Sequence, residues 1–300
     1  MINGNFLIGH ETDFKNKTGV TIILAPNGAV GGVSVRGAAP GTRETDLLRP
    51  MNTVQEAHGI MLAGGSAFGL AAATGVMTYL HEQGIGFKAG EHLVPIVPAA
   101  VIFDLSCGQF AYPDEAMGYA AAKNATADNV LQGNIGAGCG ATIGKLFGPE
   151  MKSKGGVGFA SVTLADGTEI CAVVVVNAVG DVYDTKGDFV SGVNHEEGLT
   201  TTDLLLAGAK FGDLAGQNTT IGCVMTNAKL TKEEVNKLAD VAHDGLALAI
   251  KPVHTAFDGD TMFALASGEV ETNLLALQAA CVEVVRQAVV NGIKHRCLGE

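Results

Sequence analysis

A threonine at the entrance of an apolar strand is the first residue whose surroundings could support chemistry. The stretch QNTTIGCV, residues 217–224, passes from a polar segment directly into an apolar run. Asn-Thr-Thr at such a join is either a turn, because Asn accepts tight turns and Thr favours strands, or a point of self-cleavage. Cleavage between Asn218 and Thr219 would make Thr219 an N-terminal nucleophile. Taken by themselves, these few residues favour the turn.

Two aspartates in HTAFDGDTMFALASG, residues 254–268, form a second candidate group. Asp258 and Asp260 are two residues apart, so in an extended segment their carboxylates project to the same side. They are either part of a solvated turn around Gly259 or a pair that orients a lysine, or the amine and hydroxyl of a nucleophile. The D-x-D-x-D-G spacing of a calcium loop is absent.

A single asparagine ends the apolar run CAVVVVN. Asn177 follows the apolar residues 171–176 near the end of a predicted core strand. A buried amide must find hydrogen-bond partners, so Asn177 is either a structural bridge or a donor to a substrate oxygen. The residues around it favour the bridge.

A glycine-rich run, GNIGAGCGATIGK (residues 133–145), is the fourth candidate. It is not a phosphate loop, because Cys139 and Leu146 occupy positions where that motif needs Gly and Ser or Thr. Closely spaced glycines such as Gly138 let backbone N–H groups approach a substrate, although tight packing needs the same residues.

The run GGSAFG, residues 64–69, has the appearance of a nucleophile elbow. However, Phe68 stands where the G-x-S-x-G motif needs its last glycine. We therefore predict that Ser66 is the N-cap of a buried helix.

Composition limits the classes of function. The 300 residues are 47% hydrophobic and 17% charged, and the net charge of −12 argues against nucleic acid or an anionic membrane as partner. Glycines interrupt the uncharged stretch 59–80, which favours a strand, a turn and a buried helix over a membrane span. No secretory signal is visible, so we expect a cytoplasmic protein. The six cysteines and eight histidines show no metal-ligand spacing, so no metal or other cofactor is predicted.

Apolar runs and helical periodicity predict alternating strands and helices. The predicted strands cover residues 19–24, 32–36, 60–62, 98–105, 157–164, 171–179, 220–226 and 261–266. The predicted helices cover residues 66–83, 113–127, 231–250 and 271–292. Asp-Gly in residues 165–169 and Asn-Gly in residues 25–32 each predict a hairpin, so the sheets are expected to be mixed or antiparallel.

Two local signals refine this pattern. Thr231 and Glu234 have the spacing of a capping box, which predicts the start of the third helix. Residues 180–214 are polar and predict a long structureless connection, a feature that is usually functional or disordered. The connection ends just before Asn218, as a flexible approach to a cleaved bond would.

Seven ordered stretches together resemble the L-aminopeptidase/D-esterase family of self-processing N-terminal-nucleophile hydrolases, which includes β-peptidyl aminopeptidases and nylon-oligomer hydrolases. They are RETDLL (43–48), GGSAFGL (64–70), VPIVPAAVIFDL (94–105), GAGCGATIGK (136–145), VVVNAVGDV (174–182), QNTTIGCV (217–224) and FDGDTMFALASG (257–268). Within that family, these stretches most resemble the nylon-oligomer hydrolase branch. The resemblance implies an α/β fold, a four-layer α/β/β/α sandwich with mixed sheets. It also implies one catalytic domain, 1–300, cut into 1–218 and 219–300.

The resemblance assigns a role to each candidate. Thr219 is the nucleophile, and its freed α-amine is the base, which suits an amine with a pKa of roughly 7.7–8.0. Asn177 helps to hold the oxyanion, Asp258 and Asp260 are the carboxylates around the nucleophile, and Lys145 is the lysine of the nylon-oligomer branch. The expected substrates are small amides, peptides or esters, and the expected assembly is a homo-oligomer of processed heterodimers.

Gly138 and Ser66 complete the candidate site as substrate-binding residues. One departure from the family is Phe103, where some members have a tyrosine, which puts any hydroxyl assistance from that position in doubt. Two other functions fit the sequence. One is a self-processing N-acyltransferase acting on an amino acid such as ornithine, and the other is a non-catalytic glycine-rich binding protein.

Overall fold

A computed structural model describes residues 5–212 and 217–295 of the chain. Within these residues, nine strands form one mixed sheet in which β10, β11, β14, β16, β2, β4, β7 and β3 are neighbours in that order and β1 pairs with β2. Their bounds are β1 Leu7–Asp13, β2 Thr18–Val35, β3 Thr42–Arg43, β4 Glu56–Ala63, β7 Ala99–Val101, β10 Gly156–Thr163, β11 Glu169–Asn177, β14 Thr219–Ala228 and β16 Thr261–Val270.

The helices and the short strands complete the fold. The helices are α1 Ala72–Glu82, α2 Glu115–Lys123, α3 Thr201–Leu206, α4 Lys232–Ala249 and α5 Leu274–Lys294, with 3₁₀ turns at Asp46–Leu48, Ser66–Ala71 and Gly136–Gly138. The short strands are β5 Phe87–Ala89, β6 His92–Val94, β8 Thr142–Ile143, β9 Ser153–Lys154, β12 Asp181–Tyr183, β13 Phe189–Ser191 and β15 Ile250–Lys251.

The long strand β2 joins two halves of the sheet. Its first part pairs with β1 and β4, and its last part pairs with β16. The predicted Asn-Gly hairpin at residues 25–32 is therefore wrong. The chain keeps its direction there, because a register shift against β4 between Leu24 and Ala29, with Gly28 at φ 77°, absorbs the extra residues as a bulge.

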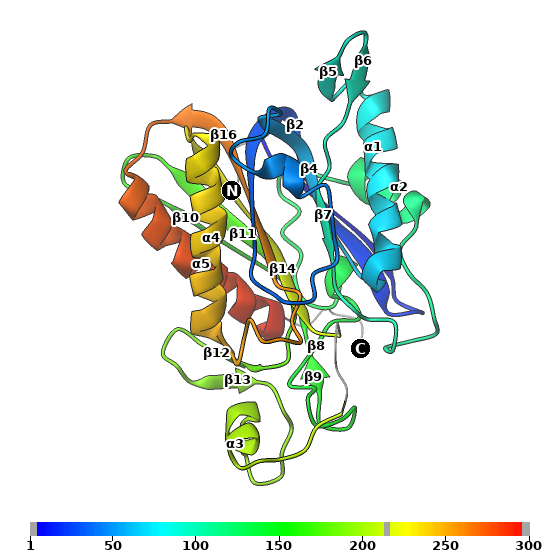
Figure 1. The fold of residues 1–300 in the computed structure, drawn as a ribbon, viewed down its shortest axis with the longest axis vertical. Helices are drawn as coiled ribbons and strands as arrows, with labels where there is room; N and C mark the ends of the chain where they lie inside the picture. The colour runs from blue at the N-terminus through cyan, green and yellow to red at the C-terminus, as the bar shows by residue number, and fades with distance from the viewer. Residues whose placement is uncertain (1–4, 213–216, 296–300) are drawn as a thin grey trace.

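The two halves stack, and helices cover their outer faces, which gives the predicted α/β/β/α order of layers. Figure 1 shows α4 and α5 on one side of the molecule and α1 and α2 on the other, with the strands between them. Alternate residues of one strand enter different cores. Val174 of β11 packs in the cluster under α4 and α5, whereas Val173 and Val175 pack in the cluster between the sheets. Because both faces of the strands are buried, their sequences read as continuous apolar runs.

Several local predictions are confirmed. The hairpin through residues 165–169 joins β10 to β11, which pair antiparallel. The capping box is present at the start of α4, where Thr231 accepts from the Glu234 amide and Glu234 accepts from the Thr231 amide.

The connection after β11 is more structured than the sequence predicts. As far as residue 212 it contains β12, β13 and α3, and α3 has a capping box between Thr200 and Asp203. The buried carboxylate of Asp181 ties these pieces together, since it accepts hydrogen bonds from the Val193 amide and from the amide and hydroxyl of Thr201. The last residues of the predicted loop, 213 and 214, lie outside the described part.

The uncharged stretch 59–80 folds as β4, a 3₁₀ turn and α1, as predicted. Helix α5 is the one described helix that is long and apolar enough to cross a membrane, with 39% of its most apolar window buried. Its apolar residues Leu277, Cys281, Val285 and Ala288 are buried in the core beneath α4 and α5. Packing in this core accounts for the apolar face of α5.

Candidate active site

Three segments that are distant in sequence meet where β14 begins. β14 is a central strand, and its first residue, Thr219, lies opposite Asn177 at the end of β11. On the other side, Asn218 forms a parallel β-bridge with Asp258, three residues before β16. The fold therefore brings together the predicted nucleophile, asparagine and aspartates.

The peptide group between Asn218 and Thr219 is held on both sides. The Thr219 hydroxyl lies 2.5 Å from the Asn218 carbonyl oxygen and donates to it. The backbone N–H of Gly259 donates to the same oxygen over 2.8 Å. A side chain at position 259 has no room, because its Cβ would lie 2.5 Å from the Ala39 carbonyl oxygen and 2.8 Å from the Thr219 hydroxyl. The structure thus presents a polarised carbonyl beside a hydroxyl.

Lys145 and Asn177 lie against the preceding residue. The Lys145 amino group donates to Asn177 Oδ1 over 2.6 Å and to the Gln217 carbonyl oxygen over 2.9 Å. The Asn177 side-chain amide also donates to the Gln217 carbonyl, over 3.3 Å. In the continuous chain Gly259 is therefore a backbone donor to the Asn218 carbonyl, and the Asn177 amide is directed one residue upstream.

Burial changes the acid–base behaviour of Lys145. Its side chain is enclosed, and loss of hydration lowers its pKa to about 7, although the negative charges nearby, Asp258 among them, act in the opposite direction. A lysine with a pKa near 7 is partly neutral at physiological pH, so it can accept a proton.

The two aspartates hold backbone groups. Asp260 Oδ1 accepts from the Thr220 amide over 2.6 Å, and Asp258 Oδ2 accepts from the amide and hydroxyl of Thr255 over 2.7 and 2.6 Å. Within the described residues, neither carboxylate bonds to the Thr219 hydroxyl. Burial and the nearby charge of Asp260 raise the pKa of Asp258 to about 6. In the uncut chain, Asp258 and Asp260 therefore orient the backbone around Thr219 rather than the Thr219 hydroxyl.

Gly138 and Ser66, the two residues predicted to bind substrate, have structural roles in the uncut chain. A Cβ at Gly138 would lie 2.3 Å from the Val157 amide nitrogen, so this glycine allows close packing of the chain. Ser66 is not an N-cap. Gly65 precedes the 3₁₀ turn, Ser66 is its first residue at φ 52°, and the Ser66 amide donates to the Ile102 carbonyl. The described contacts give neither residue a partner at Thr219.

A buried carboxylate that the sequence analysis missed lies beside these glycines. Asp104 is 2% exposed, and its Oδ1 accepts from the Gly65 amide over 2.7 Å. A Cβ at Gly64 would come within 2.0 Å of Asp104 Oδ2, so no side chain fits there. Burial raises the pKa of Asp104 to about 6. The Asp104 carboxylate holds the turn after β4 in place. Its ionised form loses hydration there, which is unfavourable.

We expect Asp104→Asn to be more stable than wild type at pH 7 and to lose this advantage in acid. Burial raises the pKa of Asp104 in the folded state, so the protonated form is the one that contributes to stability. This contribution is fully present below about pH 4 and is lost as the pH rises through about 6. A rise in the pKa of Asp104 from 3.8 to about 6 corresponds to about 3 kcal/mol in the free energy of unfolding. Asn keeps the oxygen that accepts from Gly65. Melting temperatures measured at several pH values check this, and a constant difference between the two proteins would contradict it.

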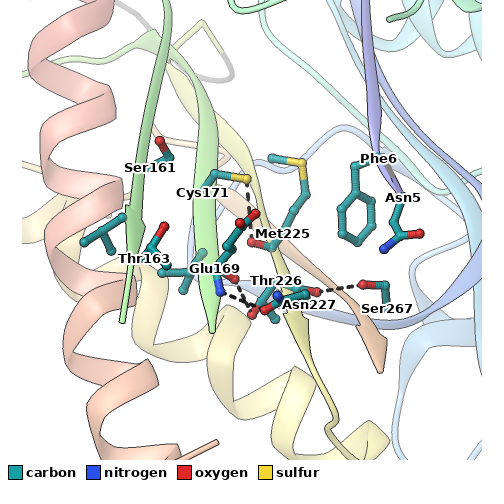
Figure 2. Close-up of a pocket in the computed structure, with 12 residues that line it drawn as sticks. Asn5, Phe6, Ser161, Thr163, Glu169, Cys171, Met225, Thr226, Asn227 and Ser267 are labelled. Carbon is teal, nitrogen blue, oxygen red and sulfur yellow. Dashed lines mark hydrogen bonds between the residues drawn. The ribbon is translucent and has the colours of Figure 1, made fainter. Parts of the chain in front are cut away.

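The pocket next to the site has room for a small molecule. Its volume is about 260 Å³, and Phe103, Thr142, Lys145 and Gln217 are among its lining residues. Another pocket, drawn in Figure 2, lies around Met225, Thr226 and Asn227, near the far end of β14. It is about 26 Å along the strand from Thr219, and its volume of about 20 Å³ holds little more than one water molecule. The larger pocket is therefore the candidate for substrate.

No group of three or more His, Cys, Asp or Glu side chains that could hold a metal ion occurs in residues 5–212 and 217–295.

Comparison with solved structures identifies the fold. Over 97% of its length the chain superposes on the L-aminopeptidase D-Ala-esterase/amidase of Ochrobactrum anthropi, covering 84% of that chain with a TM-score of 0.74 and 19% identity. That structure is described as a variant of the N-terminal-nucleophile hydrolase fold. The present chain has the same fold.

Sequence comparison gives the family. Residues 4–295 match peptidase family S58, and the chain belongs to that family. It is 47% identical to an uncharacterized aminopeptidase of Mycobacterium leprae, over 86% of this chain and 73% of the relative. It is 33% identical to the 6-aminohexanoate-oligomer endohydrolase of a Kocuria strain, over 93% of this chain and 81% of the relative. The chain is a hydrolase of peptide or other amide bonds.

Two further contacts in the site were not foreseen. Gly259 is predicted only as the centre of a turn, and no sequence pattern links His254 to Asp260. The available signal was Asp-Gly-Asp itself, since a glycine between two buried acids indicates a close approach of another backbone.

Proposed function

We propose that this hydrolase cuts its own chain between Asn218 and Thr219 and then uses Thr219 as an N-terminal nucleophile. The observation that carries the proposal is the Asn218 carbonyl oxygen, which accepts from both the Thr219 hydroxyl and the Gly259 amide. A hydroxyl beside a carbonyl that already has a fixed backbone donor is the arrangement that acyl transfer requires.

Self-cleavage begins with a base that the uncut chain already has. The α-nitrogen of Thr219 is a peptide nitrogen before the cut, so it cannot accept the hydroxyl proton. A neutral Lys145 suits this step, because its lowered pKa leaves part of the population uncharged near pH 7. The Thr219 oxygen then attacks the Asn218 carbonyl carbon, and Gly259 donates to the oxyanion.

The intermediate collapses by breaking the Asn218–Thr219 C–N bond. The Thr219 nitrogen takes the proton and becomes a free amine, and the Asn218 acyl group becomes an ester on the Thr219 oxygen. Water hydrolyses this ester to leave a carboxylate on Asn218. Residues 1–218 and 219–300 then remain together, because β14 pairs along its length with β11 of the first chain.

Turnover repeats the same chemistry with an external amide. The free α-amine of Thr219 takes the hydroxyl proton, the substrate acyl group moves to the Thr219 oxygen, and the leaving amine departs with a proton. Water releases the acid. The 260 Å³ pocket beside Lys145 suits the acyl part of the substrate, because Gln217, which precedes the cleaved bond, lines it.

The relatives indicate a general class of substrate rather than one compound. An aminopeptidase and a 6-aminohexanoate-oligomer endohydrolase are both among them. We propose small peptides, linear amide oligomers and related esters as substrates. A cytoplasmic location and a homo-oligomer of processed heterodimers stay predictions.

A panel of substrates tests this function. Purified protein is incubated with α-peptide, β-peptide and aminohexanoate amides and with p-nitroanilides, and released amine is measured. An added amino-acid acceptor distinguishes acyl transfer from hydrolysis, since an N-acylated acceptor would indicate a transferase. Absence of amide cleavage across the panel would overturn the proposed substrate class.

A further inference from the structure

A histidine bridges the acidic loop to the nucleophile strand. His254 donates from its backbone amide to Asp260 Oδ2 over 3.1 Å, and its ring Nδ1 lies 2.7 Å from the same oxygen. The other oxygen of Asp260 accepts from the Thr220 amide over 2.6 Å. A carboxylate accepts only, so the Nδ1 of His254 carries a proton. The result is a continuous path from an imidazole, through one carboxylate, to the residue after Thr219.

Asp260 is also tied to the site through its backbone. Asp260 is buried, and its backbone carbonyl accepts from the amides of Arg36 and Gly37. Its neighbour Gly259 donates to the Asn218 carbonyl. A shift of the Asp260 side chain therefore moves both the backbone of the nucleophile and the donor to the carbonyl that reacts.

A second histidine supports the first from helix α4. The rings of His243 and His254 meet edge to face with centroids 4.7 Å apart, and His243 Nε2 lies 3.0 Å from the Ser34 carbonyl oxygen. That carbonyl can only accept, so His243 donates from Nε2. Burial lowers the pKa of His243 to about 4 and keeps it neutral. The ring of His254 is thus packed against a neutral partner that is itself fixed.

The backbone of His254 is held in a conformation that few residues adopt. Its φ is 57°, in the left-handed region. Such values are uncommon for residues other than Gly, although Asn, Asp and His adopt them more often than the rest, and they concentrate at functional sites. The turn presents the ring to Asp260.

We propose that His254 is a positioning residue for both self-cleavage and turnover: it holds Asp260 so that the Thr220 amide, and with it Thr219, keeps its place beside the reacting carbonyl. The inference rests on the proposed function. His254 contacts no reacting atom in the structure, so it acts through Asp260 and through the backbone that Asp260 holds.

Two substitutions separate the hydrogen bond from the turn. His254→Gly accepts the positive φ and removes the ring, whereas His254→Asn accepts it too and places an amide donor near the position of Nδ1. We expect His254→Gly to slow self-cleavage and to lower kcat by roughly ten- to a hundredfold, the scale of a lost hydrogen bond to a charged group. KM should change much less, and His254→Asn should recover most of both rates.

Lys17→Gly is the matched control, because Lys17 is also non-glycine with a positive φ of 59° and its side chain is exposed. We expect it to leave both rates unchanged.

The cut is followed by intact mass, turnover by steady-state kinetics and folding by melting temperature. A His254→Gly protein that melts earlier but keeps kcat would overturn the inference. So would a folded His254→Asn protein as slow as His254→Gly. The proposed function is judged separately, on whether the wild-type chain is cut and its activity requires Thr219.

Discussion

Thr219→Ala is expected to remain a single uncut chain with no measurable amide hydrolysis. Ala lacks the hydroxyl that attacks the Asn218 carbonyl, so neither the ester nor the free α-amine can form. Removal of a nucleophile lowers turnover by roughly three orders of magnitude or more. The wild-type protein should separate under denaturing conditions into residues 1–218 and 219–300, the second beginning Thr-Thr-Ile-Gly. Intact-mass measurement shows both results directly.

Thr219→Ser is the control for this prediction. Serine keeps a hydroxyl in the same place, so part of the cleavage and part of the activity should remain. The side chain at 219 is 3% exposed, and neither replacement adds volume to its surroundings. A fully active wild-type enzyme found only as the uncut chain would reject self-processing and return Asn-Thr-Thr to the role of a turn.

The elements of the fold could be predicted because their apolar patterns are strong. Both faces of β11 and β14 are buried, so each strand is visible as a long apolar run. The path of β2 could not be read from Asn-Gly. A hairpin and a bulge use the same residues, and only the partners on either side, β1, β4 and β16, decide between them. The residues after β11 likewise gain their structure from Asp181, a long-range contact that no local pattern contains.

The residue types in the sequence indicated which side chains belong to the candidate site. They did not indicate which atoms of these side chains are in contact. The family resemblance brought Thr219, Asn177 and Lys145 forward as candidates, and the structure places them near one another. The position of Gly259 depends on the bridge between Asn218 and Asp258, which are 40 residues apart in sequence, and on the close approach of Ala39. The lowered pKa of Lys145 has the same origin, because burial is its main cause and burial is a property of the assembled fold.

The rate of self-cleavage is expected to rise with pH through about 7 and then level off. In the uncut chain the base must be a group other than the α-amine of Thr219, and burial lowers the pKa of Lys145 to about 7. An amine acts as a base in its neutral form, so the rate follows the deprotonated fraction of Lys145 and grows as the pH increases. Newly translated full-length chain, transferred to buffers from about pH 5.5 to about pH 8.5 and sampled over time, gives this profile.

Lys145→Met should leave the chain uncut at every pH in that range, since a thioether of similar length fills the space without accepting the proton. Asn177 Oδ1 and the Gln217 carbonyl oxygen each lose one donor in this variant, so its melting temperature is measured beside wild type to show that it is folded. Lys145→Arg is the second variant. Its guanidinium keeps the charge and the donors but stays protonated, so it too should remain uncut. A folded Lys145→Met protein that cleaves at the wild-type rate, or a wild-type profile that is flat across pH 7, would assign the base of self-cleavage to another group.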